Sequence, residues 1–426
     1  MSSSTRPARV MVAVAAALLL AYVLVWLSVS NFDIGRSDFT AFYVGGTLLR
    51  GGHGAQLYNE AVQLPLHTAL IAPDTEGNLP FVNSPVAAAL VAPVTMLDLH
   101  LAYRIWGAME LGLLILAVVI AVRSAPWPER CPRIWKLAAG MAALSSMGTW
   151  TVLAQAQWTP IVALGLALAY RDWRRGNDAR GAAVLVMTAA TAKPHLALGL
   201  VAFMLGWRNR RVIVGALGGA LAFGVASLLL VGPAGIAGFF GIVASSTTRW
   251  DLRTMLSVVG LAGTYLGNGA AARITAAVAS VAACAVAYWL GSRVRRDRRR
   301  LDVALAGATV LSLLAAPHAY PHDLALLAPV LAWSVALAVH RFGVRLPSAR
   351  RGRPLIIVVG LWTVINVAAL VDFSDRAAFP PGQMTALTLI AAAAVAWVAS
   401  DTVRDGETTV GSLAHGLRRR RVAAHL

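Results

Sequence analysis

The residues that decide the fold are Val10–Ser30, VMVAVAAALLLAYVLVWLSVS, an uncharged run of 21 residues preceded by Arg6 and Arg9. A helix of that length rises about 30 Å, which is the thickness of the hydrocarbon core of a bilayer. The run is longer than the ~7 to 15 apolar residues of a signal peptide, and no small-x-small cleavage pattern closes it. The sequence therefore predicts a retained transmembrane helix, with the N-terminus on the cytoplasmic side.

The composition indicates that the whole chain, and not only its first helix, belongs to a membrane protein. Of 426 residues, 58% are hydrophobic and 13% are charged, which is far more apolar surface than a soluble core needs. We expect an all-α, polytopic integral protein of the plasma membrane. The net charge of +18 comes from arginines in short loops between apolar runs, where they face lipid headgroups, so nucleic acid is excluded as a partner. Two cysteines, Cys131 and Cys284, offer neither a disulfide framework nor a metal cluster.

The loops fall into two sets by charge, because cytoplasmic connections carry the excess of Lys and Arg. The basic set comprises 123–136, 171–180, 208–211, 293–300, 341–353 and the tail that ends with 418–421. The other set, predicted to be extracytoplasmic, comprises 31–82, 154–157, the turn around 193, 232–270, 317–322 and 372–384. Both termini are then cytoplasmic. The chain divides into an integral membrane domain, 1–400, and a basic cytoplasmic tail, 401–426, which we expect to be disordered.

About twelve helices connect the two sets of loops. Their predicted ranges are 10–30, 102–122, 137–153, 158–170, 181–192, 195–207, 212–231, 271–292, 301–316, 323–340, 354–371 and 385–400. Several, such as 158–170, are too short to span about 30 Å, and short segments are tolerated where they line a water-filled cavity. Two further apolar segments, 84–97 and 254–266, are predicted to be re-entrant or in-plane pieces at the outer face. Counting the first as a full span would place every later arginine loop outside.

Polar and ionisable side chains gather at the outer ends of the predicted helices. One group lies in Asn31–Asn59, NFDIGRSDFTAFYVGGTLLRGGHGAQLYN, the first polar segment after the first predicted helix. The groups comprise Asp33, Arg36 and Asp38; Asn83 and Ser84; Gln155 and Gln157; Lys193 and His195; and His318, Tyr320, His322 and Asp323. Charges inside membrane segments are costly and usually face a cavity with a partner. One shared cavity that faces outward accounts for all of these residues.

Each group also has a simpler interpretation. Asn31–Asn59 can equally be an ordinary solvated loop, and Lys193 can be a lysine that snorkels at a helix end. His318 and His322 can cap helices, as Asp323 can cap the helix that follows it, and the two glutamines can hydrogen-bond across helices. A functional role is favoured for Lys193, because only two of the 37 basic residues are lysine and a proline breaks the helix directly after it.

Five stretches of the chain resemble, in order, the glycosyltransferase C superfamily and within it family 87, the polyprenyl-phosphate-sugar-dependent mannosyl- and arabinofuranosyltransferases. They are SDFTAFYVGGTLLRGGHGAQLYN, LPFVNSPVAAALVAPVTML, AQAQWTPIVALGLALAYRDWRRG, GAAVLVMTAATAKPHLALGL and the turn APHAYPHD, beginning at residue 37 and ending before residue 325. The resemblance implies a fold of the glycosyltransferase C type. It also implies that the acidic residue after the first helix is the catalytic base, and Asp38, rather than Asp33, aligns with it.

The implied reaction suits the residues gathered above. A carboxylate that is ionised at neutral pH can take the proton of an acceptor hydroxyl as the oxygen attacks the anomeric carbon, which predicts inversion. The departing lipid phosphate needs cations or hydrogen-bond donors. The residues expected to bind the donor phosphate or the substrate are Lys193, His195, His318, His322, Arg36, Tyr43, Gln157 and Asn83.

The resemblance favours mannose as the sugar, with arabinofuranose as the alternative. The expected partners are the polyprenyl-phosphate-sugar donor, a lipid-linked or polysaccharide acceptor, and membrane lipids. No metal-ligand spacing occurs, so we expect neither a metal nor another cofactor. A lipid or glycan flippase would also need broken helices and a polar cavity, but the polar groups lie on one side rather than at the midplane, and the two halves show no repeat. A scaffold protein would leave Asp38 dispensable.

Overall fold

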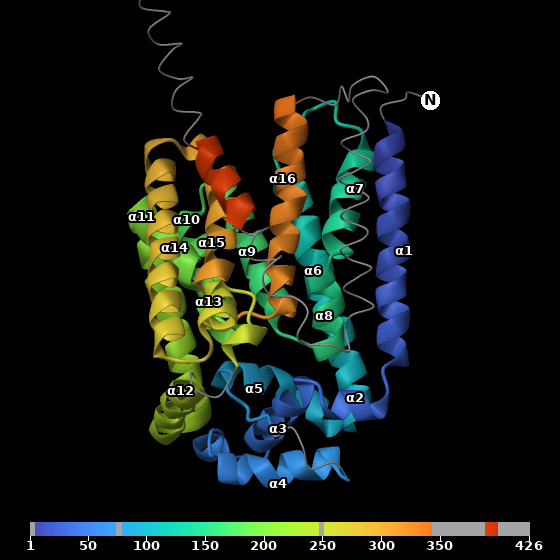
Figure 1. Ribbon diagram of the computed structural model, residues 1–426, viewed down its shortest axis with the longest axis vertical. Helices are drawn as coiled ribbons and strands as arrows, with labels where there is room; N and C mark the ends of the chain where they lie inside the picture. The colour runs from blue at the N-terminus through green and yellow to red at the C-terminus, as the bar shows by residue number, and fades with distance from the viewer. Residues whose placement is uncertain (1–4, 74–78, 247–250, 343–387, 399–426) are drawn as a thin grey trace, which may run out of the picture.

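The computed structural model describes residues 5–73, 79–246, 251–342 and 388–398, and every regular element in these ranges is a helix (Figure 1). The all-α prediction is therefore confirmed for the described part of the chain. The predicted helix 354–371 and the predicted tail 401–426 lie outside the described residues.

Long apolar helices run side by side along the molecule. Among the described helices, four are long and apolar enough to cross a membrane: α1 (Arg6–Ser28), α6 (Leu99–Ser124), α12 (Arg210–Ser246) and α14 (Ala270–Arg296). The pair α7 (Arg133–Leu144) and α8 (Met147–Gln155), bent by 46°, makes a fifth when it is counted as one span. Large apolar side chains on the outer faces, such as Leu229 at 81% exposed, fit contact with lipid. The chain is a polytopic membrane protein.

Shorter helices pack among the long ones. They are α9 (Thr159–Arg174), α10 (Asp178–Ala192), α11 (Leu198–Trp207), α15 (Leu301–Ala315), α16 (Leu327–Phe342) and the segment Thr388–Val398. With 15 residues each, α10 and α15 rise about 22 Å, less than the ~30 Å of a bilayer core. α10 ends before the turn at Lys193 and Pro194, and α15 ends before the turn that carries His318.

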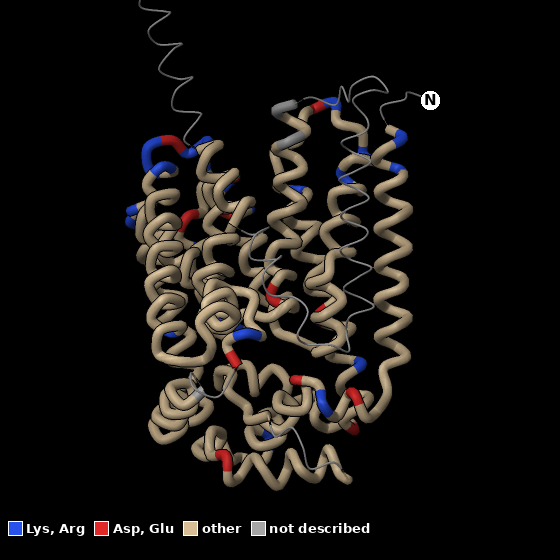
Figure 2. The backbone as a smooth tube through the Cα atoms, viewed as in Figure 1, with Lys and Arg blue, Asp and Glu red and all other residues tan. Residues whose placement is uncertain are grey.

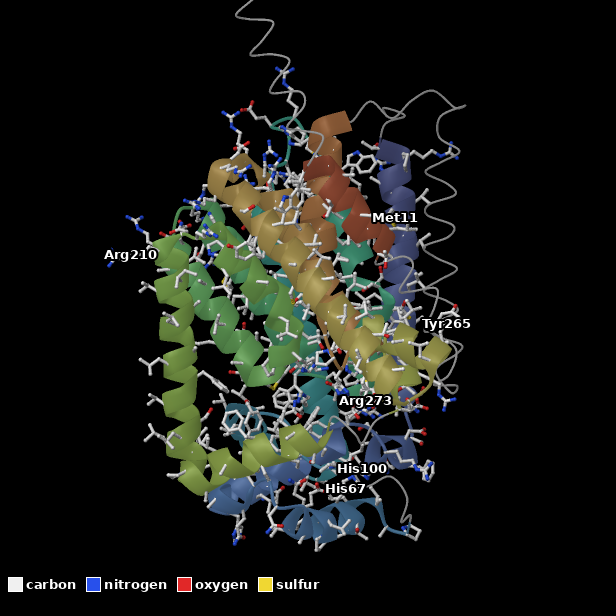
Figure 3. All side chains as sticks on the ribbon, turned by 60° about the vertical axis from the view of Figure 1, so that its left-hand side comes forward. Met11, His67, His100, Arg210, Tyr265 and Arg273 are labelled. Atoms are coloured by element: carbon white, nitrogen blue, oxygen red, sulfur yellow. The ribbon has the colours of Figure 1, made fainter. Side chains whose placement is uncertain are left out.

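Basic residues cluster at one end of the bundle, whereas the other end carries both acidic and basic residues (Figure 2). The loops that join α6 to α7, α9 to α10 and α14 to α15 carry arginines and lie at the end where the N-terminus is found. Figure 3 shows Arg210 at this end, with His67 and His100 at the other. We call the first the basic end.

A layer of short helices covers the opposite end. It contains α2 (Asn31–Gly35), α3 (Phe39–Arg50), α4 (Glu60–Ile71), α5 (Pro85–Val91) and the 3₁₀ helix η3 (Ala92–Met96). Serine hydroxyls start two of them, because Ser30 and Ser84 accept hydrogen bonds from backbone N–H groups of the first turn, at 3.2 and 3.1 Å. The predicted in-plane piece 84–97 belongs to this layer as α5 and η3, and α4 lies across the bundle direction (Figure 1).

Two predicted helices differ in shape from the prediction. The range 137–153 is not one straight helix, because the chain bends between α7 and α8 where the Ser145 hydroxyl donates to the Met141 carbonyl at 2.6 Å. The helix predicted to end at residue 231 continues to Ser246 after a kink at Gly232. The φ of Gly232 is 64°, a value that glycine adopts without steric cost. Beyond the kink, α12 crosses the covered end of the bundle (Figure 3). The other predicted in-plane piece, 254–266, contains α13 (Val258–Leu266).

Candidate active site

Asp38 lies directly before α3 and is held by two glutamines from the turn between α8 and α9. The backbone N–H of Asp38 donates to Oε1 of Gln155 at 3.1 Å. Nε2 of Gln157 donates to Oδ2 of the Asp38 carboxylate. The side chain of Asp38 is half-buried, whereas Asp33 is exposed and accepts a hydrogen bond from the Ser30 hydroxyl at 2.6 Å. The carboxylate of Asp38 is therefore oriented by its neighbours and still reachable by a ligand.

The turn that carries the glutamines is fixed on several sides. Ala156 adopts the left-handed conformation, with φ 49° and ψ 50°, so that the residues before and after it both turn toward Asp38. The Tyr103 hydroxyl donates to the carbonyls of Leu153 and Ala154, at 2.9 and 3.0 Å. Buried Trp158 packs against Trp106 with ring centroids 4.9 Å apart. Such support from neighbouring helices keeps a catalytic group in one geometry.

A buried ion pair lies on the other side of this turn. Nζ of Lys193 donates to Oδ1 of Asp323 at 2.6 Å, and both side chains are almost fully buried. The Thr159 hydroxyl donates to the same oxygen at 2.8 Å, and the Tyr320 backbone N–H donates to Oδ2 at 2.9 Å. Asp323 is the third residue of the 3₁₀ helix η7 (Pro321–Leu326), where its side chain accepts from the N-cap residue Tyr320, and it also pairs with the Lys193 ammonium. Lys193 ends α10, and Pro194 turns the chain away there.

Three histidines surround the ion pair. The rings of His195 and His318 lie 5.9 Å apart, and Tyr320 lies beside both His318 and His322, at 4.8 and 5.7 Å between ring centroids. Nε2 of His322 is 3.6 Å from Oδ1 of Asp323. Burial lowers the pKa of His318 to about 4, opposed by Asp323 and assisted by Lys193. At neutral pH, His318 is therefore a neutral hydrogen-bonding group rather than a cation.

The residues Gln155–Thr159 join Asp38 and the Lys193–Asp323 ion pair into one site. Gln155 and Gln157 bond to Asp38, and Thr159 bonds to Asp323. A carboxylate that can accept a proton thus lies one short turn away from an ammonium group that can hold an anion. This pairing is what a group transfer with an anionic leaving group requires.

The comparison with protein-family models matches residues 81–317, more than half of the 426-residue chain, to glycosyltransferase family 87. The chain belongs to glycosyltransferase family 87. The matched range contains Asn83, Gln157, Lys193 and His195, whereas Asp38 precedes it and His318 follows it. No curated protein and no solved structure matches the chain.

The remaining predicted residues of this family 87 glycosyltransferase have other contacts. Nδ2 of Asn83 donates to the Ala192 carbonyl at 3.3 Å, which fastens the start of α5 beside Lys193. The Tyr43 hydroxyl donates to the Leu97 carbonyl at 2.7 Å and thereby joins α3 to η3. Arg36 is exposed, and its guanidinium lies 4.4 Å above the Phe32 ring, so the described contacts do not bring it to the ion pair.

Sequence reasoning missed Thr159, which bonds to Asp323, and assigned no role to Glu110, a buried residue of α6. Thr159 carried no signal, because a threonine that opens a helix is ordinary. Glu110 did carry one, since it is the only acidic residue within the 26 residues of α6. An ionisable residue inside an apolar helix is a functional candidate by default.

Proposed function

We propose that this glycosyltransferase moves mannose from a polyprenyl-phosphate donor to a lipid-linked or cell-envelope glycan acceptor, with inversion and with Asp38 as the general base. The observation that carries the proposal is the joining of the Asp38 carboxylate to the buried Lys193–Asp323 pair by the turn Gln155–Thr159. A base and an anion-binding cation are the two groups that such a transfer needs.

The reaction is a single displacement. The acceptor hydroxyl gives its proton to the Asp38 carboxylate while its oxygen forms a bond to the anomeric carbon. The bond from that carbon to the phosphate oxygen breaks, and the lipid phosphate leaves with the electron pair. Attack from the face opposite the leaving group inverts the anomeric centre. The hydrogen bond from Gln157 to Oδ2 orients the Asp38 carboxylate, which takes the proton.

Lys193 supplies the positive charge for the leaving phosphate. An ammonium group has three N–H donors, and among the described residues Lys193 uses one, for Asp323. The other two can reach phosphate oxygens while Asp323 keeps the ammonium in place. His195, His318 and His322 add N–H donors around it. In a site shielded from water, such preoriented donors stabilise developing charge strongly.

The proposed side of the membrane follows from the arginines. Loops rich in Lys and Arg remain in the cytoplasm, so the basic end faces the cytoplasm and the layer of α2–α5 faces outward. Asp38 then opens to the extracytoplasmic side of the plasma membrane, where cell-envelope acceptors are found. Exposed apolar faces let a polyprenyl chain approach within the bilayer.

The test uses purified protein in lipid nanodiscs with a membrane lipid extract as acceptor. Labelled polyprenyl-phosphate-mannose and labelled polyprenyl-phosphate-arabinofuranose are supplied in parallel, and the lipid-linked and polysaccharide products are separated. We expect label only from the mannosyl donor. Label from the arabinosyl donor alone would replace the sugar in the proposal, and label from neither would contradict it.

A further inference from the structure

Glu110 is a buried acidic residue of the described chain that has no partner. Its side chain is on α6, the residue is 1% exposed, and neither carboxyl oxygen has a hydrogen-bond partner within the described residues. The other buried acidic residues there are all in salt bridges: Asp172, Asp178, Asp302 and Asp323. Because burying an unpaired carboxyl is costly, an apolar residue at this position would make a more stable helix bundle.

Glu110 lies about as far along α6 from its basic end as Lys193 lies along α10. Fourteen residues separate it from Ser124 at the basic end of α6, which is a rise of about 21 Å. Lys193 follows the 15 residues of α10, about 22 Å from the same end. α6 packs against α9, whose first residue, Thr159, donates a hydrogen bond to Asp323 of the ion pair. Glu110 therefore belongs to the layer of the proposed donor site.

The unpaired groups near this layer include both hydrogen-bond acceptors and hydrogen-bond donors. Within the part of the chain that the structure describes, the Glu110 oxygens, Oε1 of Gln157 and Nε2 of His195 have no hydrogen-bond partner. Lys193 adds two N–H donors that bond to none of the described residues. Trp106, one turn from Glu110 on the same face of α6, packs on Trp158 next to Gln157. Since buried polar groups are nearly always paired, this set indicates a ligand rich in hydroxyl and phosphate oxygens.

We propose that Glu110 binds the hydroxyl groups of the transferred sugar while Lys193 holds the donor phosphate. This inference rests on the proposed function and assigns the sugar-binding part of the same site. A hydroxyl group donates to one carboxyl oxygen and can be reached by a second donor at the same time, so adjacent sugar hydroxyls suit the two oxygens of Glu110. Glu110 is then a residue that determines sugar recognition and is not needed for the fold.

The experiment compares the wild type with Glu110→Leu and Glu110→Gln in nanodiscs, with Glu129→Leu as the control. Glu129 is exposed and lies in the loop between α6 and α7 at the basic end. Each protein is heated alone, with polyprenyl phosphate, and with polyprenyl-phosphate-mannose, and its unfolding temperature is recorded. Steady-state transfer then gives KM and kcat for the mannosyl donor.

For the wild type and Glu129→Leu, we expect the mannosyl donor to raise the unfolding temperature more than polyprenyl phosphate does. Glu110→Leu should unfold at the wild-type temperature or above, because an unpaired buried carboxyl is gone, and should lose that difference. Its KM for the donor should rise about tenfold or more. Glu110→Gln, which keeps the shape, should lie between.

Wild-type KM in both Glu110 variants, or an unchanged difference between the two lipids, would overturn the assignment. If Glu110→Leu does not fold, the Glu110→Gln result decides, and wild-type behaviour of that variant overturns the assignment as well. A wild type that transfers no sugar, but binds the mannosyl lipid more tightly in a way that depends on Glu110, would refute the proposed function and leave this inference standing.

Discussion

The ion pair between Lys193 and Asp323 allows stability and sugar transfer to be separated. Their side chains are 7% and 1% exposed, and Nζ lies 2.6 Å from Oδ1. Lys193→Met leaves Asp323 with the Thr159 hydroxyl and the Tyr320 amide as donors, but with no ammonium group. Removing one partner of a buried pair costs about 3–5 kcal/mol, because the other charge stays buried. We expect a clear fall in unfolding temperature.

The double variant Lys193→Met with Asp323→Asn separates the two roles. Replacing both charged partners with neutral groups of similar shape is often close to neutral for stability, so most of the lost stability should return. Transfer from polyprenyl-phosphate-mannose should not return, because the phosphate has lost its cation. Arg253→Met is the matched control, since Arg253 and Asp251 also lie 2.6 Å apart but are 63% and 34% exposed. Exposed pairs add little stability, so no change is expected there.

The assay is tryptophan fluorescence during heating in nanodiscs, followed by labelled transfer with the same preparations. Two results would refute the reasoning. If Lys193→Met unfolds at the temperature of Arg253→Met, the buried pair does not stabilise the bundle. If the double variant transfers sugar at the wild-type rate, Lys193 does not hold the phosphate.

Two further predictions concern the turn and the histidines. Ala156→Val should reduce both transfer and stability, because a β-branched residue is strained at φ 49°, whereas Ala156→Gly should keep both. Equal activity of the two variants in the transfer assay would contradict this prediction. His318 has a folded pKa of about 4, below the ~6.5 of the unfolded chain, so protonation of the unfolded state should cost stability as the pH falls from about 6.5 to 4. Unfolding temperatures at pH 7.5 and 5 should therefore differ less for His318→Gln than for the wild type, and an equal difference would argue against a buried neutral imidazole.

The sequence predicted most helices of this fold because apolar runs of defined length have few alternatives in a membrane protein. It placed the end of one helix at Gly232–Pro233, where the structure bends α12, but could not show that the helix resumes across the covered end. The bend between α7 and α8 was missed as well, because two serines inside an apolar run do not exclude a helix.

The site was harder to predict, because its contacts join residues far apart in the chain. Lys193 and Asp323 are 130 positions apart, and Gln157 and Asp38 are 119 apart. Charge sorting indicated that these residues share one side of the bundle, but it could not pair them. The sequence prediction rested on polar residues at the helix ends and so did not include Glu110, although a lone carboxyl inside an apolar helix is itself a signal of function.

Asp38→Asn tests the central claim most directly. Asparagine keeps the shape and can still accept the hydrogen bond from Gln157, so folding and binding of polyprenyl-phosphate-mannose should be unchanged. Transfer should fall by about a hundredfold or more, because the carboxamide cannot take the proton of the acceptor hydroxyl. Asp33→Asn, five positions earlier and exposed, is the control and should transfer at the wild-type rate. Full transfer by folded Asp38→Asn would contradict the assignment of Asp38 as the base.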